Sequence, residues 1–401
     1  MSVPRWSYRK SLASLLACLI LLQAAAVIVA GPDRPPWGDE SHFVDTVRLF
    51  ASRPSLETLR TYPEMSGPLP FALYAAWGHL AGLGLWNLRL LSLVIALGSY
   101  LVFHRLLWRM CGDGRLAFLF ALLFALQPYM IGFSIFVFTD GAAILFLLAA
   151  LWGAVAGRAV LILLGLAGAL LCRQYAVFAV MAVAAWALLL RNSPERREFA
   201  GRALGAAAAA AVPLLTLFLL WGHVSPDNRL RGLYLGGGLA FHPSALVLYI
   251  SLLFWYLLPA AAYAGRRVYT RGRLIAAAAL SPLYWLFPVE ASPAAKAIGV
   301  QTVGLLHKAV ENFPAAPWLP HAFFFAGFLF GLPIVLHIAQ SAVARIRART
   351  GDVVLLLDSG VIAFLLVMPF SYLAWEKYMM PLAPLVLARL AALRVPGDPA
   401  S

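Results

Sequence analysis

The sequence predicts an all-α fold, a polytopic bundle of about twelve transmembrane helices. Hydrophobic residues make up 62% of the 401 residues and charged residues only 12%, whereas a soluble protein carries about 25% charged residues. The apolar residues form repeated runs long enough to cross a bilayer, and short basic loops separate the runs. A soluble fold cannot bury this much apolar surface, because a single core stops growing at a smaller size.

The net charge of +14 would suit a nucleic-acid partner, but its distribution does not. Many basic residues lie in short loops between apolar runs, as the positive-inside rule describes for cytoplasmic loops. These residues are Arg105, Arg109 and Arg115; Arg191, Arg196, Arg197 and Arg202; Arg266, Arg267, Arg271 and Arg273; Arg345, Arg347 and Arg349. A nucleic-acid-binding protein gathers its basic residues on one face. We therefore expect no nucleic-acid partner.

The first apolar run, residues 12–30, follows a basic segment from Arg5 to Lys10. It is longer than the apolar region of a cleaved signal peptide, about 7–15 residues, so we interpret it as a retained helix that enters from the cytoplasm. The expected crossings are residues 12–30, 88–107, 116–134, 141–157, 159–172, 175–190, 203–221, 244–264, 274–289, 319–340, 353–370 and 380–395. An even number of crossings leaves both termini in the cytoplasm.

Residues 31–86 form the predicted first outer loop of a single domain covering residues 1–401. Its first part, residues 31–70, is the longest polar stretch of the chain. If residues 71–85 also crossed the membrane, the basic loop around Arg109 would lie outside, against the positive-inside rule. The short run with Trp77 and Trp86 at its end instead suits a helix lying along the outer membrane surface.

Cysteine and histidine spacing predicts neither disulfides nor a metal site. Cys18 and Cys172 fall in apolar runs, and Cys111 falls in a basic loop, so no two share an outer loop. The histidines form no H-E-x-x-H or other ligand pair. We therefore expect no bound zinc.

Polar residues beside or inside apolar runs are the candidate functional residues, because they are costly in a membrane. Asp39 and Glu40 follow the first helix, Asp140 closes an apolar run, and Arg173 interrupts another. Each has a structural alternative: the acidic pair as solvated loop residues, and Arg173 as the ion-pair partner of Asp140. Further candidates in the outer loops are Arg229, Arg231, Glu376 and Lys377. For Glu376 and Lys377, interfacial anchoring is the structural alternative.

The order of these residues resembles the dolichyl-phosphate-glucose α-1,2-glucosyltransferase family and, more broadly, the GT-C superfamily. That superfamily includes protein O-mannosyltransferases and bacterial lipid A aminoarabinose transferases. The matching segments are Pro36-Trp37-Gly38-Asp39-Glu40, the Pro-rich stretch from Thr61 to Tyr74, Phe138-Thr139-Asp140, Arg173-Gln174 and Glu376-Lys377-Tyr378. The chain has Lys377 where the glucosyltransferases have Arg, and it lacks an N-x-S/T sequon and the large loops of eukaryotic members. These differences favour a bacterial relative in the inner membrane.

The resemblance implies a GT-C-like fold and an inverting glycosyltransferase at the extracytoplasmic face. Its donor would be a polyprenyl-phosphate-linked sugar, and its acceptor a glycan, lipid or protein. Asp39 would be the general base, with Glu40 beside it in the catalytic pair. Asp140 and Glu376 would position the acceptor. The donor phosphate would be bound by Arg173 and Lys377, with Arg229 and Arg231 as further cations. The resemblance also implies that a divalent metal is at most optional, and we expect no cofactor.

Two other classes remain open. About twelve crossings with both termini inside is also the pattern of many transporters, so a multi-pass transporter or lipid flippase is the alternative. Transporters place polar residues near the midplane, often in paired halves, whereas here they cluster towards one face and the first-loop motif has no second copy. A non-catalytic scaffold would leave Arg173 and the acidic loop unexplained.

Overall fold

A computed structural model describes residues 6–31, 34–235, 240–291, 295–296, 299–313, 316–371 and 373–394. Within these residues the regular secondary structure is helical throughout, with no strand, so the all-α prediction is confirmed. In the part of the chain that the structure describes, six helices are long and apolar enough to cross a membrane: α1 (Tyr8–Ala30), α5 (Leu85–Cys111), α8 (Thr139–Ala156), the segment Pro194–Trp221 ending in α11, α19 (Leu319–Arg347) and Val353–Phe370, which contains α20. The chain is thus a multi-pass membrane protein.

Two further spans are bent. The helices α6 (Gly114–Ala125) and α7 (Pro128–Ile135) meet at 71°, and Pro243–Tyr256 (α13) meets Leu258–Arg267, which begins with α14, at 75°. In each pair a proline lies in the first turn of the second helix, where it cannot donate a backbone hydrogen bond. Counting each pair as one span gives up to eight spans by length and composition.

The predicted count of crossings stays a prediction. Residues 159–172 and 175–190 form the shorter apolar helices α9 (Ala159–Cys172) and α10 (Val177–Leu190). Residues 274–289 cover parts of α15 (Arg271–Leu280) and α16 (Leu283–Leu286), and residues 380–395 cover α21 (Ala383–Ala391). Each of these is shorter than the roughly 20 residues that an untilted helix needs to span the bilayer.

The chain forms two compact units: residues 1–180 with 198–232, called unit 1, and residues 181–197 with 233–401, called unit 2. The prediction of one domain over residues 1–401 is left as a prediction beside this division. Unit 1 holds the predicted first outer loop, and unit 2 holds α19, α20 and α21.

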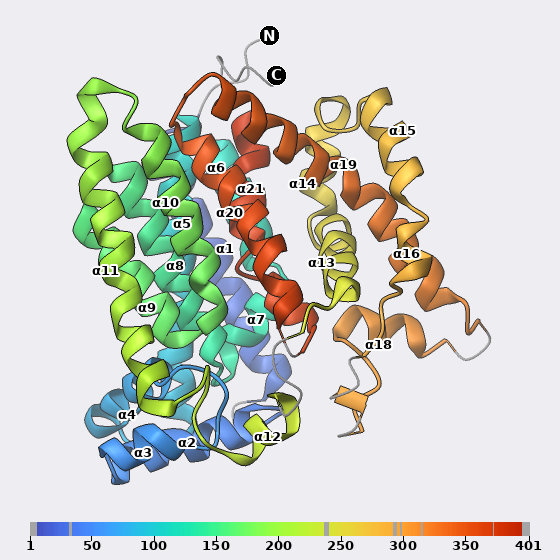
Figure 1. Cartoon of the computed structure of the whole chain (residues 1–401). Coiled ribbons are helices and arrows are strands. Elements are labelled where there is room, and N and C mark those ends of the chain that lie inside the picture. Colours follow the sequence, from blue (N-terminus) through green and yellow to red (C-terminus); the bar gives the residue numbers. More distant parts are fainter. Residues whose placement is uncertain are drawn as a thin grey trace. The chain divides into compact units, whose positions relative to one another are not determined.

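In unit 1, the helices α2 (Glu40–Ser52), α3 (Leu56–Thr61) and α4 (Leu69–Ala81) lie together at one end of the long helices (Figure 1). The neighbouring α8 and α9 pack very closely, because a Cβ atom at Gly165 would come within 2.5 Å of the Ala150 backbone nitrogen. Small residues permit such close helix packing in membranes. This packing fixes the ends of α8 and α9, which carry Asp140 and Arg173.

The helix α4 covers most of the predicted interfacial segment, residues 71–85. Its 13 residues extend about 20 Å, which is shorter than the hydrocarbon core of about 30 Å, and α4 is not among the membrane-length helices. The Tyr74 hydroxyl hydrogen-bonds the Ser92 hydroxyl of α5 at 2.7 Å, and the Trp77 indole donates to the Asn87 carbonyl at 2.8 Å. These contacts hold α4 against α5, and the single crossing stays a prediction.

In unit 2, α13 and α19 pack side by side, with Ser251 of α13 donating to the Phe324 carbonyl of α19 at 2.9 Å. The short helix α18 (Leu305–Glu311) lies near one end of this pair (Figure 1). The helices α19, α20 (Val353–Val367) and α21 are linked by buried polar residues, which are described below.

Candidate functional site

The turn at residues 37–40 presents Asp39 at the start of α2. Gly38 has a φ of +58°, a conformation that glycine adopts without cost. The Glu40 amide donates to the Trp37 carbonyl at 3.2 Å, and the Phe43 amide donates to the Asp39 carbonyl at 3.2 Å. The Asp39 side chain makes no cap hydrogen bond to the helix, and 44% of it is exposed. The carboxylate therefore remains accessible to solvent.

The neighbouring Glu40 is fully buried and paired with Arg89 of α5. The Arg89 Nε and Nη2 atoms donate to the two carboxylate oxygens at 2.9 and 2.8 Å. Those oxygens also accept from the backbone amides of Trp37 at 3.1 Å and Val137 at 3.0 Å. Both oxygens of the carboxylate are thus engaged inside the protein, and Glu40 joins the turn at Asp39 to α5 and to the segment before α8.

Asp140 and Arg173 form a buried ion pair, which is the structural alternative that the sequence offered for Arg173. The Arg173 Nη2 atom lies 2.5 Å from the Asp140 Oδ2 atom, and the Tyr175 hydroxyl donates to Oδ1 at 3.2 Å. Asp140 lies in the first turn of α8, and Arg173 directly follows α9. The pair joins the same ends of two closely packed helices.

Glu64 is a charged residue of this region that the sequence analysis did not single out. Its side chain is buried, and its Oε1 atom lies 2.6 Å from the Nδ1 atom of His42, one turn along α2 from Asp39. The His42 Nε2 atom lies 3.7 Å from the Asp39 Oδ1 atom. Burial by itself lowers the pKa of His42, but the hydrogen bonds and charges of Asp39 and Glu64 outweigh it and raise that pKa to about 9. The only signal in the sequence was an acidic residue inside the Pro-rich stretch.

The backbone around Glu64 is held by residues from two other segments. The Asn228 side-chain amide donates to the carbonyls of Tyr62 and Glu64 at 2.9 and 3.0 Å. The Gln174 amide donates to the Met65 carbonyl at 2.7 Å, and the Gly67 amide donates to the Cys172 carbonyl at 3.1 Å. The predicted Arg173–Gln174 motif therefore contacts the Pro-rich stretch directly.

Arg229 and Arg231 lie at the start of α12 (Arg229–Leu235), also in unit 1. Arg229 is exposed. The Arg231 guanidinium pairs with Asp227 and donates to the Trp221 carbonyl at 3.5 Å. Its backbone amide donates to the Asn228 side chain at 3.0 Å, so Arg231 belongs to the same hydrogen-bonded segment that holds residues 62–64.

Glu376 and Lys377 lie in unit 2. The buried Glu376 carboxylate accepts from the backbone amides of Leu306 at 3.0 Å and His307 at 2.8 Å, in the first turn of α18, and from the Tyr256 hydroxyl at 2.7 Å. A carboxylate is favourable at a helix N-terminus because the amides there point towards it. The Lys377 ammonium lies 6.0 Å from the ring centre of Trp375 and 5.6 Å from that of Tyr378.

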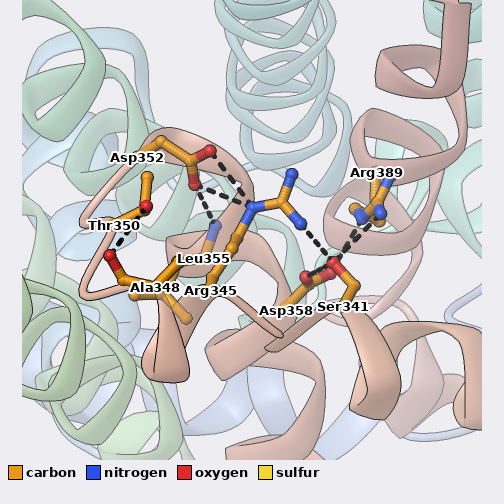
Figure 2. Close-up of polar contacts among 8 residues, drawn as sticks. All are labelled: Ser341, Arg345, Ala348, Thr350, Asp352, Leu355, Asp358 and Arg389. Carbon is orange, nitrogen blue, oxygen red and sulfur yellow. Dashed lines mark hydrogen bonds and ion pairs between the residues drawn. The ribbon is translucent and has the colours of Figure 1, made fainter. Parts of the chain in front are cut away.

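Four charged residues, three of them buried and one (Asp352) partly exposed, form a second network in unit 2 (Figure 2). The Arg389 Nε atom of α21 donates to Asp358 of α20 at 2.9 Å, and the Ser341 hydroxyl of α19 also donates to Asp358. Arg345 donates to Ser341 at 2.6 Å and to both oxygens of Asp352 at 3.1 Å. The two arginines and two aspartates balance in charge and join α19, α20 and α21.

The structure thus gathers Asp39, Glu40, Asp140 and Arg173 in unit 1, linked through Val137, whose amide contacts Glu40 three residues before Asp140. Glu376 and Lys377 belong to unit 2, so their convergence with Asp39 stays a prediction. Among the described residues, no three His, Cys, Asp or Glu side chains are arranged to hold a metal ion.

Comparisons with known proteins yielded two structural likenesses. No family model matches the chain, and no curated protein matches it significantly. The structure resembles that of ArnT from Cupriavidus metallidurans bound to undecaprenyl phosphate, with a TM-score of 0.48 and 14% identity, over 96% of this chain and 77% of that one. It also resembles the apo state of that protein, with a TM-score of 0.47 and 14% identity, over 95% and 76% of the two chains. With TM-scores below 0.5, neither likeness establishes a family or a substrate for this chain.

Proposed function

We propose that this protein is an inverting membrane glycosyltransferase that moves a sugar from a polyprenyl-phosphate carrier to an acceptor, with Asp39 as general base. One observation carries the proposal. Glu40, Glu64 and Asp140 are buried and contact Arg89, His42 and Arg173 respectively, whereas the carboxylate of Asp39, which directly precedes Glu40, is 44% exposed. Buried residues that are paired with opposite charges thus surround the turn that presents the accessible Asp39 carboxylate, as a positioned general base requires.

The proposed reaction is a single displacement at the anomeric carbon. The acceptor hydroxyl or amine attacks that carbon as its proton passes to Asp39. The bond between the anomeric carbon and the phosphate oxygen breaks on the opposite side, and polyprenyl phosphate leaves with the electron pair. Attack and departure on opposite faces invert the anomeric centre. Asp39 returns its proton to water after the product leaves.

The donor phosphate needs cations, because it gains negative charge as the bond breaks. We assign this role first to Arg173, whose planar guanidinium suits phosphate oxygens and whose orientation is set by Asp140. Arg229, Arg231 and Lys377 are the further phosphate-binding residues of the proposal. In this proposal Glu40, Asp140 and Glu376 do not contact the reacting atoms. They position the substrates indirectly, because they hold the backbone segments that surround the site.

The proposal places the site at the extracytoplasmic face of the cell inner membrane, with both termini in the cytoplasm. Its basis is the distribution of basic residues among the loops. Single cysteines at positions 45, 113 and 269 test this placement in intact cells. A membrane-impermeant thiol reagent should label position 45 and leave positions 113 and 269 unlabelled. Labelling at position 113 would mean that residues 71–85 cross the membrane.

The activity is tested with purified protein and a radiolabelled polyprenyl-phosphate sugar. We expect the wild type to release polyprenyl phosphate and form a labelled product, and Asp39→Asn to lower the rate by about 10²–10⁴-fold. Asp45→Asn is the matched control, because Asp45 is an exposed carboxylate on the same helix, paired with Arg48 at 3.4 Å. An Asp39→Asn variant with the activity of the control would overturn the assignment of the base.

A transporter or lipid flippase is the second candidate. It is favoured by two buried charged residues, Asp358 in the membrane-length segment that contains α20 and Arg389 in the neighbouring α21. Charged residues inside membranes often mark ion or substrate pathways. Here each charge contacts its opposite, which equally suits a structural link between helices. The same assay separates the classes, because a transporter moves the lipid-linked sugar without cleaving it.

A further inference from the structure

Asp39, His42 and Glu64 form a chain of alternating charges across the start of α2. The imidazole lies between the carboxylates, with Nε2 3.7 Å from Asp39 and Nδ1 2.6 Å from Glu64. The Thr46 hydroxyl, one turn further along α2, also donates to Glu64 at 3.3 Å. His42 is 48% exposed and Glu64 is buried, so the chain runs from the interior to the accessible carboxylate.

The inner end of this chain is rigid. Asn228 binds the carbonyls on both sides of Pro63, and the Tyr62 hydroxyl donates to the Ser66 carbonyl at 2.6 Å. A Cβ atom at Gly67 would collide with the Leu171 carbonyl, so the segment lies directly against the end of α9. The Glu64 carboxylate therefore has a fixed place from which to hold the imidazole.

The outer end of this chain is the Asp39 carboxylate, which lies beside His42 at the start of α2. Asp39 follows Gly38, which lies in the left-handed region, and makes no side-chain cap hydrogen bond to α2. Its backbone position is set by the turn, but the direction of its carboxylate depends on neighbouring side chains. His42 lies one helical turn away and on the same face.

We infer that His42 is a positioning residue for Asp39, and that Glu64 fixes His42 from its other side. The inference rests on the proposed function, in which Asp39 is the general base. A base is effective only when it is held within hydrogen-bonding reach of the proton that it removes. Misplacement of a reacting group by about 1 Å costs on the order of 10²-fold in rate.

The charge of His42 agrees with this role and not with that of a proton acceptor. Its pKa of about 9 keeps the imidazole protonated at neutral pH. The titratable groups that face it are Asp39 on its own helix and Glu64 on the 62–67 segment. Tyr62 lies beside Glu64, and burial and the charge of Glu64 raise the pKa of Tyr62. From α4, the aromatic Phe71 reaches the neighbouring Phe43, with ring centres 6.0 Å apart.

The contacts are tested without any activity measurement. In the full-length protein with labelled histidine, NMR titration of His42 should give a pKa near 9, and His42→Gln identifies the resonance. In Asp39→Asn and in Glu64→Gln the pKa should move down towards 6.5, because each variant removes a neighbouring negative charge. A wild-type His42 that titrates near 6.5 would show that the chain of contacts does not form.

The positioning role is tested by sugar transfer with a polyprenyl-phosphate sugar. His42→Gln should lower kcat on the order of 10²-fold and leave the KM for the donor nearly unchanged. In the Asp39→Asn background it should cause no further loss. His79→Gln, at an exposed histidine of α4, is the control and should retain wild-type kcat. An undiminished kcat in His42→Gln, or an equal loss in the Asp39→Asn background, would overturn the inference and leave the proposed function standing. Absence of transfer by the wild type would overturn the proposed function instead, whatever the titration shows.

Discussion

The Arg89 guanidinium donates hydrogen bonds to both carboxylate oxygens of Glu40, at 2.9 and 2.8 Å, although 49 residues separate Arg89 from Glu40 in the chain. Both side chains are buried, and Arg89 also donates to the Arg34 carbonyl at 2.9 Å. Bidentate contacts of this kind give geometric specificity as well as energy. The pair anchors the turn that carries Asp39 on the membrane-length helix α5.

We expect Glu40→Gln to act mainly on stability. Removing one partner of a buried ion pair costs about 3–5 kcal/mol, whereas removing both charges costs less. The melting temperature of the purified protein should therefore fall in Glu40→Gln and recover in part in the Glu40→Gln/Arg89→Gln double variant. Sugar transfer per folded molecule should fall less than in Asp39→Asn. A stable Glu40→Gln variant that is less active than Asp39→Asn would move the base by one residue.

Variants of the Asp140–Arg173 pair can distinguish a structural role of Arg173 from a role in phosphate binding. Arg173→Gln alone leaves a buried carboxylate unpaired and should lower the melting temperature, and Asp140→Asn should do the same. In the double variant Asp140→Asn/Arg173→Gln the melting temperature should recover, but polyprenyl-phosphate binding should stay weak because the cation is missing. Restored phosphate binding in the double variant would show that Arg173 serves the fold alone.

His42 predicts how stability depends on pH. A histidine whose pKa rises on folding, here from 6.5 to about 9, contributes stability that is fully present below pH 6.5 and is lost as the pH rises through about 9. The melting temperature of the wild type should exceed that of His42→Gln at pH 7, and the difference should shrink between pH 8 and pH 10. Thermal unfolding followed by tryptophan fluorescence measures it. A difference that grows with pH would contradict the protonated state of His42.

The network around Ser341 predicts a large effect in unit 2. Arg389→Ala would leave the buried Asp358 without its arginine, at a cost of about 3–5 kcal/mol. Arg202→Ala is the control, because Arg202 is exposed and pairs with Glu198 at 3.6 Å, and exposed pairs contribute about 0–1 kcal/mol. The thermal midpoints of the two variants should differ clearly. Equal midpoints would mean that Asp358 is compensated in another way.

The sequence by itself determined the class of the protein and the segments worth examining. Hydrophobicity and run length are local properties, so they identify membrane helices without knowledge of packing. A charged side chain in an apolar run is costly in free energy, and this cost likewise identified Asp140 and Arg173 as candidates. An ion pair between them was one of the two interpretations that the sequence offered for Arg173. The prediction of a single crossing within residues 71–107 also came from loop charge alone.

Only the tertiary structure decided which charges are partners. Arg89 forms an ion pair with Glu40, and Glu64 forms one with His42. Glu376 accepts hydrogen bonds from the backbone amides of α18. These partners lie 22 to about 70 residues apart, and no local pattern relates them, because helix packing brings them together. Asp39 and Glu40 are adjacent in the sequence, so sequence analysis alone grouped them as one acidic pair. Folding places them in different environments, with Glu40 enclosed by Arg89 and backbone amides and Asp39 left half exposed at the turn.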